Sequence, residues 1–285
     1  PDYVVIADGL NQEIINRRRN ILPTIFRTKK NNATTKGTKN TVRFQTETFG
    51  TDTRHSAYLR LGVDRHAMLA ASKHLDLQSD LLVTEVRGAF VKSNVVPDWI
   101  EMDVVKPQDD GEKCEYDENL TNLMRELLTI SSTSFPTRLS DKGTIINPNI
   151  LEEDGGSWKL YCDIRAMTND GGEVKDSFER NLEGRVDLES LEVHAGMGYV
   201  DSDPSSKLIK SALQVLDELS IPHAIVEGFG ASDSRYFAGH GSDVFDFGPR
   251  GDNLHGPNEW VWVPSLDENA RFYYHLAMQL DNSGK

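Results

Sequence analysis

A short apolar segment close to the beginning of the chain restricts the folds that the sequence can adopt. Residues 3–7 are apolar and rich in β-branched side chains, and the run ends at Asp8 and Gly9. A continuous apolar run of this length, bounded by a turn signal, predicts a buried strand that delivers Asp8 into a loop. A strand of this kind needs neighbouring strands, so the rest of the chain must supply its sheet.

The carboxy-terminal part of the chain has the alternation of helices and strands that such a sheet requires. An apolar stripe after Pro204, which suits a first helical turn, predicts a helix, and residues 223–227 predict a strand. A second short strand is predicted at 243–248 and a closing helix at 266–280. This order resembles half of an α/β sheet, and the other half is not evident in this chain apart from the strand at the beginning.

The middle of the chain mixes helical and strand patterns in a different order. Alternating residues at 41–49 predict a strand with one solvated face, after a polar loop or hairpin tip at 32–40. Residues 64–75 predict a helix with Asp64 as its N-cap. A glycine turn at 154–156 separates two further predicted strands. Helices and strands in this order are typical of an α+β sandwich.

These patterns predict an α/β protein with two kinds of domain. We place the α+β sandwich, an open sheet with helices on one face, at residues 42–195. Residues 1–41 and 196–285 are then the first part and the carboxy-terminal part of an α/β domain. The length of 285 residues allows one large domain or two of ordinary size.

The composition argues against several classes of protein. The chain carries 45 Asp and Glu residues against 31 Lys and Arg residues, a formal net charge of −14, which argues against a nucleic-acid-binding surface. No apolar run approaches the roughly 20 residues that span a bilayer, so we expect no membrane segment. The two cysteines, Cys114 and Cys162, are too few for a disulfide framework, so we expect a cytoplasmic location.

The residues best placed for chemistry lie in two loops that follow predicted strands. Gly230, Ala231 and Ser232 are small residues at a strand exit, where backbone N–H groups can approach a ligand closely. The second loop is rich in Gly and Pro and holds His255, followed by Glu259. Because α/β proteins place their sites at strand ends, His255 is a candidate metal ligand or acid–base group. The alternative is a loop histidine without a special role.

Five segments in this order resemble the zinc-dependent exopeptidase and deacylase family, which includes aminoacylases, glutamate carboxypeptidases, succinyl-diaminopimelate desuccinylases and carnosine-type dipeptidases. The segments are residues 1–9, 53–64, 143–148 with 163–165, 230–235, and 255–259. The similarity covers most of the chain and begins partway into the family pattern. It implies a partial three-layer α/β catalytic domain with an inserted α+β, ferredoxin-like lid that also serves for dimerisation.

The resemblance also implies roles for individual residues. Asp8 and His255 correspond to ligands of two zinc ions that share a bridging hydroxide. His55 corresponds to a lid histidine, often reaching across a dimer, that contacts the scissile carbonyl oxygen. Asn147 and Arg165 correspond to the lid residues that hold the substrate, and an arginine can bind a carboxylate through two parallel hydrogen bonds.

The loop at 230–235 corresponds to a substrate-contacting loop of the family. Two further candidate positions, Arg17 and the lid asparagine, have an alternative interpretation. Arg17 is a candidate for binding substrate carboxylates, with a solvated basic face as the alternative. Asn94 competes with Asn147 as the lid asparagine, and we prefer Asn147 because residues 163–165 follow at a plausible hairpin distance.

The match lacks the segments that complete a zinc site in this family. A catalytic zinc takes three protein ligands and an open position, whereas the remaining ligands and the general-base glutamate belong to family segments that precede the strand of Asp8. We therefore expect a homodimeric enzyme that uses zinc to hydrolyse a dipeptide or an N-acyl amino acid. This chain would be an incomplete portion of it, with Pro1 a truncation or processing boundary. The alternative is a non-catalytic dimerisation or ligand-binding fragment.

Overall fold

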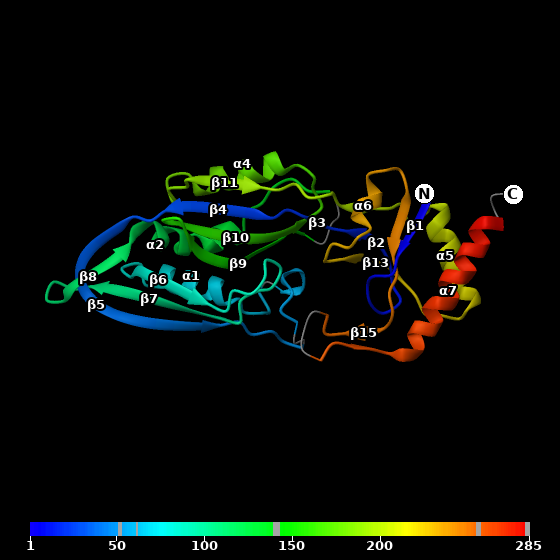
Figure 1. Ribbon diagram of the computed structural model, residues 1–285, viewed down its shortest axis with the longest axis horizontal. Coiled ribbons are helices and arrows are strands. Elements are labelled where there is room, and N and C mark those ends of the chain that lie inside the picture. Colours follow the sequence, from blue (N-terminus) through cyan, green and yellow to red (C-terminus); the bar gives the residue numbers. More distant parts are fainter. Residues whose placement is uncertain (51–52, 61, 139–142, 255–257, 283–285) are drawn as a thin grey trace.

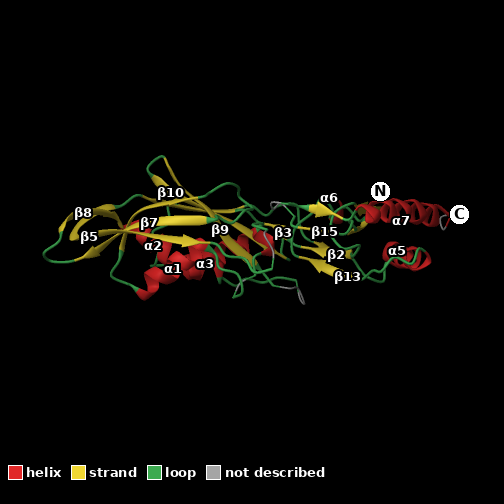
Figure 2. Ribbon diagram, turned by 90° about the horizontal axis from the view of Figure 1, so that it is seen from below, coloured by secondary structure: helices red, strands yellow, loops and turns green. Residues whose placement is uncertain are grey.

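The computed structural model describes all residues except 51–52, 61, 139–142, 255–257 and 283–285, and it shows an elongated chain with two parts (Figure 1). The part that holds both chain termini, here called the terminal part, contains one mixed sheet and two long helices. The other, here called the middle part, contains among its described residues a five-stranded sheet and a four-stranded sheet with four α-helices. Figure 2 shows the two parts end to end along the long axis. This arrangement confirms the predicted mixed α/β fold class.

The sheet of the terminal part is built around the predicted first strand. That strand is confirmed as β1 (Tyr3–Ile6), which pairs in parallel with β14 (Asp243–Asp246). β14 contacts β2 (Ile14–Arg18), which is flanked by β13 (Ile225–Gly228) in parallel and by the short β12 (Val200–Asp201) in antiparallel orientation. All four residues of β1 are half-buried, although the sequence predicts a buried strand.

Two amphipathic helices lie side by side against this sheet. They are α5 (Lys207–Glu218) and α7 (Val263–Asn282), and their apolar residues form one core with β2 and β14. Phe247, just after β14, packs on Phe272 of α7 with ring centroids 4.4 Å apart. The sheet and this helical layer agree with the predicted partial α/β catalytic domain.

The first of the middle part's sheets contains the segments predicted as a lid. Its central strands are β4 (Thr24–Lys29) and β10 (Ser157–Ala166). β11 (Ser190–Val193) pairs with β4, while β9 (Ile145–Asp154) and β3 (Asn20–Ile21) pair with β10. α4 (Gly171–Leu182) connects β10 to β11 and packs against this sheet.

The second sheet of the middle part has the order β6-β7-β5-β8. These strands are β5 (Asn32–Gln45), β6 (Leu82–Gly88), β7 (Trp99–Pro107) and β8 (Glu112–Asp117). The helices α1 (Ala67–Leu77), α2 (Glu118–Arg125) and α3 (Leu127–Ser131) contribute to one core that both sheets share.

Three local predictions were wrong for identifiable reasons. Residues 32–40 were predicted as a loop but belong to β5, which is polar because most of its side chains face solvent on both faces. α1 is capped by His66, whose side chain accepts from the N–H of Met68, and not by Asp64. α5 is capped by Ser206 and begins after it, not at Pro204.

The strands divide the chain differently from the predicted boundaries. β5 crosses the predicted division at residue 42, and β4 pairs with β10 of the middle part. We infer that the division lies between β2 and β3, near Arg19, because β2 pairs within the terminal sheet and β3 pairs with β10. No helix in the described part of the chain is long and apolar enough to cross a membrane.

Candidate active site

A buried arginine joins the ends of two strands in the terminal part. Nε of Arg18, the last residue of β2, lies 2.5 Å from Oδ2 of Asp246 at the end of β14. Nη2 of the same arginine lies 3.3 Å from Oδ1 of Asp8, which follows β1. The Asp246 side chain is fully buried, and that burial raises the pKa of its carboxyl group while the charge of Arg18 opposes the rise. Arg18 therefore holds together two carboxylates, one of which is the predicted zinc ligand.

A glycine on the neighbouring strand makes room for this guanidinium. Gly228 ends β13, and a Cβ atom at this position would lie 2.8 Å from Nη1 and 2.9 Å from Cδ of Arg18. A side chain at this position would require the side chains of Arg18 and Ile15 to shift.

The predicted small-residue loop reaches the same cluster. Ser232 is buried, and its hydroxyl donates to Oδ2 of Asp246 over 2.6 Å. It also contacts the hydroxyl of Ser234. Gly230 lies at the other side of this loop, where a Cβ atom would be 3.8 Å from the hydroxyl of Tyr58. Ser232 is thus turned toward the carboxylate of Asp246, Gly230 faces Tyr58, and Ala231 is half-buried between them.

The histidine predicted in the lid lies on a turn of the middle part that approaches this cluster. His55 caps the short helix η1 (Ser56–Tyr58), and its Nδ1 accepts a hydrogen bond of 3.1 Å from the N–H of Ala57. Since Nδ1 accepts, Nε2 carries the proton in the neutral ring. The ring packs edge-on against Tyr58, with centroids 5.5 Å apart.

Tyr58 connects this turn to the strand ends. Its side chain is hydrogen-bonded to Arg18, and burial raises the pKa of its hydroxyl while the Arg18 charge opposes the rise. A hydroxyl with a raised pKa stays protonated near neutral pH and can donate a hydrogen bond. The arginine, Asp8, Asp246 and Tyr58 therefore form one polar cluster between the two parts of the molecule.

The loop that leads to His255 is anchored to the same turn. Oγ1 of Thr53 donates to the carbonyl oxygen of Leu254 over 2.9 Å. A cleft of about 210 Å³ lies here, lined by Leu10, Phe49, Gly50, Thr53, Tyr58, Arg60, Asp252 and Leu254. His255 itself lies outside the described residues, so its predicted role as a zinc ligand remains a prediction.

Asn147 lies next to the His55 turn. Its Nδ2 donates to the backbone oxygen of Ser56 over 2.8 Å, and its fully buried Oδ1 has no hydrogen-bond partner among the described residues. A β-bulge follows directly, because the register of β9 against β10 shifts beside Pro148 and leaves Asn149 without an opposite residue. Bulges commonly redirect side chains beside functional sites. The buried Asn147 oxygen lies two residues before the unpaired Asn149 of this bulge.

Arg165 lies in the same row of buried polar side chains. It forms a two-pronged ion pair with Asp163 on its own strand, with N–O distances of 2.9 to 3.2 Å, and Asp163 lies directly opposite Asn147. Asn94, the competing asparagine, accepts the N–H of Ser56 through its backbone oxygen over 2.9 Å. Both asparagines thus support the turn after His55, but only Asn147 does so with its side chain.

Arg17 is engaged away from this cluster. Its side chain forms ion pairs with Asp201 at 3.0 Å and with Glu227 at 3.1 Å. Both partners belong to strands that flank β2, so these contacts hold the terminal sheet together. Its predicted role in binding substrate carboxylates remains a prediction.

Sequence reasoning missed three members of the cluster, namely Arg18, Tyr58 and Asp246. Asp246 was placed inside the strand predicted at 243–248, whereas the structure ends β14 at this residue, so the sequence did not show that it lies at a strand end as Asp8 does. Arg18 has no signal either, because a run of three arginines normally indicates a solvated surface, whereas Arg18 and Arg19 are buried.

The described residues do not by themselves form a metal site. They contain no group of three or more His, Cys, Asp or Glu side chains with the geometry to hold an ion. Asp8, the predicted ligand among them, contacts the positive charge of Arg18. A zinc site at Asp8 would therefore need ligands from outside these residues.

Comparisons with known proteins agree with this arrangement. The model of a protein family described as peptidase family M20/M25/M40 matches residues 47–279. The structure of an aminoacylhistidine dipeptidase from Vibrio alginolyticus aligns with 97% of this chain and 64% of its own, at 13% identity and a TM-score of 0.66. Aminopeptidase PepT from Bacillus cereus aligns with 96% of this chain and 56% of its own, at 12% identity and a TM-score of 0.52. The chain thus spans less than two thirds of the length of these structures.

Proposed function

The chain belongs to the peptidase family M20/M25/M40, and from this membership we propose that it forms part of a metal-dependent hydrolase that cleaves the amide bond of a dipeptide or an N-acyl amino acid. The observation that carries the proposal is the meeting of the two parts of the molecule. The His55 turn contacts the strand ends through Tyr58 and Arg18, and the loop before His255 through Thr53. Residues distant in the sequence thus border one cleft.

His55 has the properties of a hydrogen-bond donor to a substrate carbonyl. Its Nδ1 accepts from the N–H of Ala57, which orients the ring and makes Nε2 the nitrogen that would donate to the oxygen that becomes negative during amide cleavage. The raised pKa of Tyr58 keeps a second donor protonated beside it.

The substrate-binding residues would divide their tasks. The Nδ2 of Asn147 is used by Ser56, so the group left for a substrate is the Oδ1 acceptor, which suits an amide N–H or an ammonium group. Arg165 carries the positive charge that suits a substrate carboxylate, although Asp163 already neutralises much of it. Gly230, Ala231 and Ser232 would border the bound substrate.

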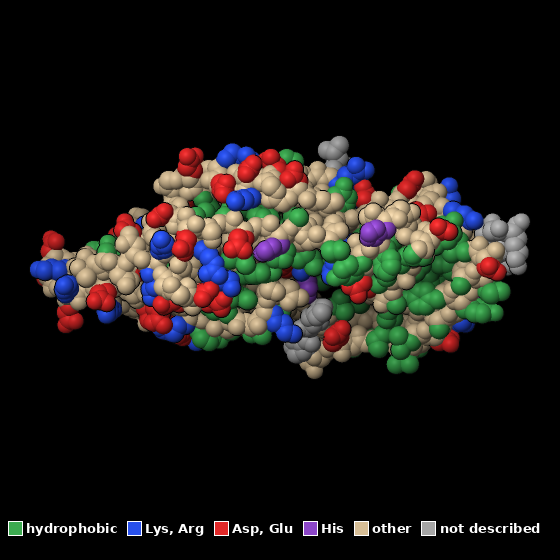
Figure 3. All heavy atoms as spheres, turned by 45° about the horizontal axis from the view of Figure 1, so that its top comes forward, with side chains coloured by type: hydrophobic (Ala, Val, Ile, Leu, Met, Phe, Trp, Pro, Cys, Tyr) green, Lys and Arg blue, Asp and Glu red, His purple; other side chains and the backbone are tan. Residues whose placement is uncertain are grey.

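We propose two zinc ions as the cofactor, with Asp8 and His255 among their ligands. Zinc would supply an activated water and polarise the substrate carbonyl. Family membership supports metal dependence, but the described residues require further ligands to complete the site. The half-buried β1 and the apolar side chains gathered over the terminal part (Figure 3) support additional polypeptide in the working enzyme. A homodimer through the middle part and a cytoplasmic location are proposals from the sequence.

A second function is favoured by one observation. The contact between Arg18 and Asp8 already satisfies the predicted ligand with a cation from the protein. A chain with this pair intact would act as a dimerisation or ligand-binding module without hydrolysis.

Hydrolysis assays distinguish these functions. The full-length polypeptide, with the segments that supply the remaining metal ligands, is incubated with a panel of dipeptides and N-acetyl amino acids, with added zinc and after chelation. We expect hydrolysis that chelation abolishes and that His55→Ala reduces by about 100-fold or more. The matched control, His194→Ala, changes an exposed histidine of the middle part and should leave the rate unchanged. Hydrolysis that survives chelation would refute the metal-dependent mechanism, and a zinc-bound protein without turnover would favour the second function.

A further inference from the structure

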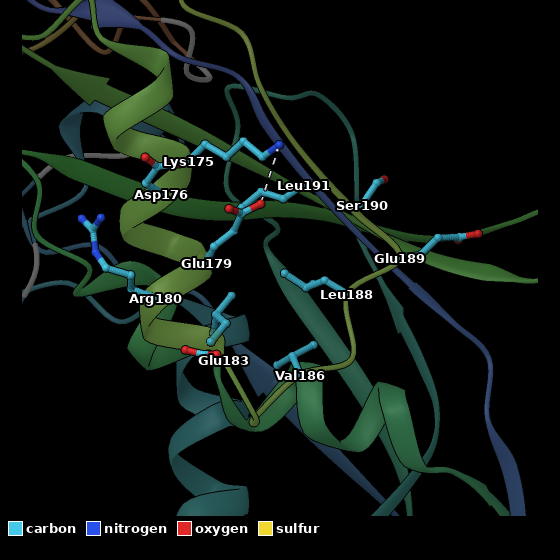
Figure 4. A pocket seen from close by; sticks show the side chains of 11 residues that line it. Lys175, Asp176, Glu179, Arg180, Glu183, Val186, Leu188, Glu189, Ser190 and Leu191 are labelled. Carbon is cyan, nitrogen blue, oxygen red and sulfur yellow. Dashed lines mark ion pairs between the residues drawn. The ribbon is translucent and has the colours of Figure 1, made fainter.

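A groove on the middle part lies between α4 and the edge strand β11 (Figure 4). Its volume is about 780 Å³, and none of the residues that line it belongs to the candidate active site. The volume falls in the range of clefts that hold ligands, roughly 300–1,000 Å³. One side is formed by α4 and the other by the segment that leads into β11.

The strand along this groove has an open edge. Within the described part of the chain, β11 pairs with β4 alone, in a regular register from Ser190 opposite Arg27 to Val193 opposite Thr24. In an antiparallel strand with one neighbour, alternate backbone N–H and C=O groups face away from the sheet. β11 is only four residues long and carries the charged Glu192, but it contains no proline, lysine or bulge that would prevent pairing along this edge. Its outer edge can therefore accept another strand.

The floor of the groove is apolar. Leu182, Val186 and Leu191 are buried beneath it, and Leu188 is half-buried at its surface. Side chains of alternate residues in an added strand would face this floor, because successive side chains of a strand point to opposite faces.

The rim of the groove carries an excess of negative charge. It contains the acidic residues Asp176, Glu179, Glu183 and Glu189 and the basic residues Lys175 and Arg180. Both basic side chains are already paired within α4, Lys175 with Glu179 at 3.6 Å and Arg180 with Glu173 at 2.8 Å. Asp176 and Glu183 are exposed and have no ion pair among the described residues. An occupant with positive charges would complement this rim.

We propose that this groove binds an extended peptide segment of another protein, in which apolar residues alternate with Lys or Arg, as an additional strand on β11. Backbone hydrogen bonds to β11 would provide the binding mode, the apolar floor would take alternate side chains, and the acidic rim would select basic ones. A second copy of this chain fits less well, because a two-fold pairing of β11 edges would bring the two acidic rims together. This docking surface is independent of the proposed hydrolysis.

Fluorescence anisotropy with a labelled peptide tests the proposal. The probe is acetyl-Val-Lys-Val-Lys-Val-Lys-amide, and the comparison probe has Glu in place of Lys. We expect binding of the Lys peptide that weakens with salt and exceeds binding of the Glu peptide by about tenfold or more. The variant Asp176→Lys/Glu183→Lys should bind the Lys peptide about tenfold more weakly than the parent protein. The control Asp109→Lys/Asp110→Lys makes the same change in net charge in an exposed turn, and its affinity for the Lys peptide should stay within roughly twofold of the parent protein.

A second probe tests the strand pairing on the unchanged protein. N-methylation of alternate peptide bonds removes the hydrogen bonds of one peptide edge, so one of the two methylated registers should bind about tenfold more weakly. Equal binding of the Lys and Glu peptides, or equal binding of all methylated forms, would overturn the proposal. Sedimentation provides a further refutation: if the parent protein is a dimer and Asp176→Lys/Glu183→Lys dissociates it, the groove binds a second copy of the chain and not another protein.

Discussion

Replacing Arg18 with methionine is the most direct perturbation of the polar cluster. Methionine keeps much of the aliphatic volume of the arginine but removes its charge and its hydrogen bonds. Asp246 would keep the hydroxyl of Ser232 as a donor and lose its only ion-pair partner among the described residues. The variant therefore measures what it costs to bury the carboxylate of Asp246 without a counter-charge.

The structure sets the expected size of this effect. The Arg18 side chain is 4% exposed and the Asp246 side chain 0%. Removing one partner of a buried ion pair costs about 3–5 kcal/mol, because an uncompensated charge remains. The hydrogen bond from Ser232 places the expected loss near the lower value, about 3 kcal/mol of unfolding free energy. A surface pair provides the control: Arg65 and Glu47 are about half exposed, so Arg65→Met should cost less than about 1 kcal/mol.

The loss should depend on pH with a definite sign. Burial already raises the pKa of Asp246 above its usual value of 3.8, and Arg18 opposes that rise, so removing the arginine raises this pKa further. A carboxyl group whose pKa is higher in the folded state binds more protons there than in the unfolded chain. Its protonation stabilises the fold below pH 3.8, and this stability is lost as pH rises through the folded pKa. The difference in unfolding free energy between Arg18→Met and the parent protein should thus be larger near neutral pH than at about pH 5.

Urea unfolding, followed by circular dichroism at several pH values, provides the assay. We expect the double variant Arg18→Met/Asp246→Asn to recover much of the lost stability near neutral pH, because the amide carries no charge to bury. The burial of this ion pair would be refuted if the unfolding free energy of Arg18→Met lies within about 1 kcal/mol of that of the parent protein, or if the loss of unfolding free energy does not change with pH.

Three further expectations concern the middle part. Asp117 caps α2 by accepting from the N–H of Leu120 and is buried, so Asp117→Ala should lower the unfolding free energy by about 2–3 kcal/mol in thermal melts. Burial lowers the pKa of His66 from 6.5 to about 4, so the protein should lose about 3 kcal/mol as the pH falls from 6.5 toward 4, a slope that His66→Gln should remove. Cys114 and Cys162 are buried and free, so a thiol reagent should label them only after urea is added, and labelling of the native protein would contradict their burial.

Much of the architecture was predictable because apolar periodicity reports burial. The runs that became β1, β13 and β14 and the stripes of α5 and α7 were identified to within a few residues. The first part of β5, residues 32–40, was not identified, because it is polar and solvent-exposed and its regularity comes from pairing with β7 and β8 rather than from its own side chains. Polar strands of this kind have no period that distinguishes them from loops.

The candidate site divides in the same way. Motif resemblance predicts roles for Asp8, His55 and Asn147, and the structure brings the turn of His55 to the strand ends. The motif resemblance did not identify Arg18, because an arginine is expected at the surface until its partners are known. Those partners are 10 and 228 residues away along the chain, so no local pattern contains them.

By itself, the sequence determined the fold class, the order of the main elements and the motif positions, because each depends on residues that lie close together along the chain. Only the tertiary structure decided that Arg18 contacts both Asp8 and Asp246, that Asn147 presents an acceptor beside a bulge, and that β11 leaves an open edge beside an acidic groove. The physical reason is that buried charges and strand edges obtain their energies from partners that folding brings together.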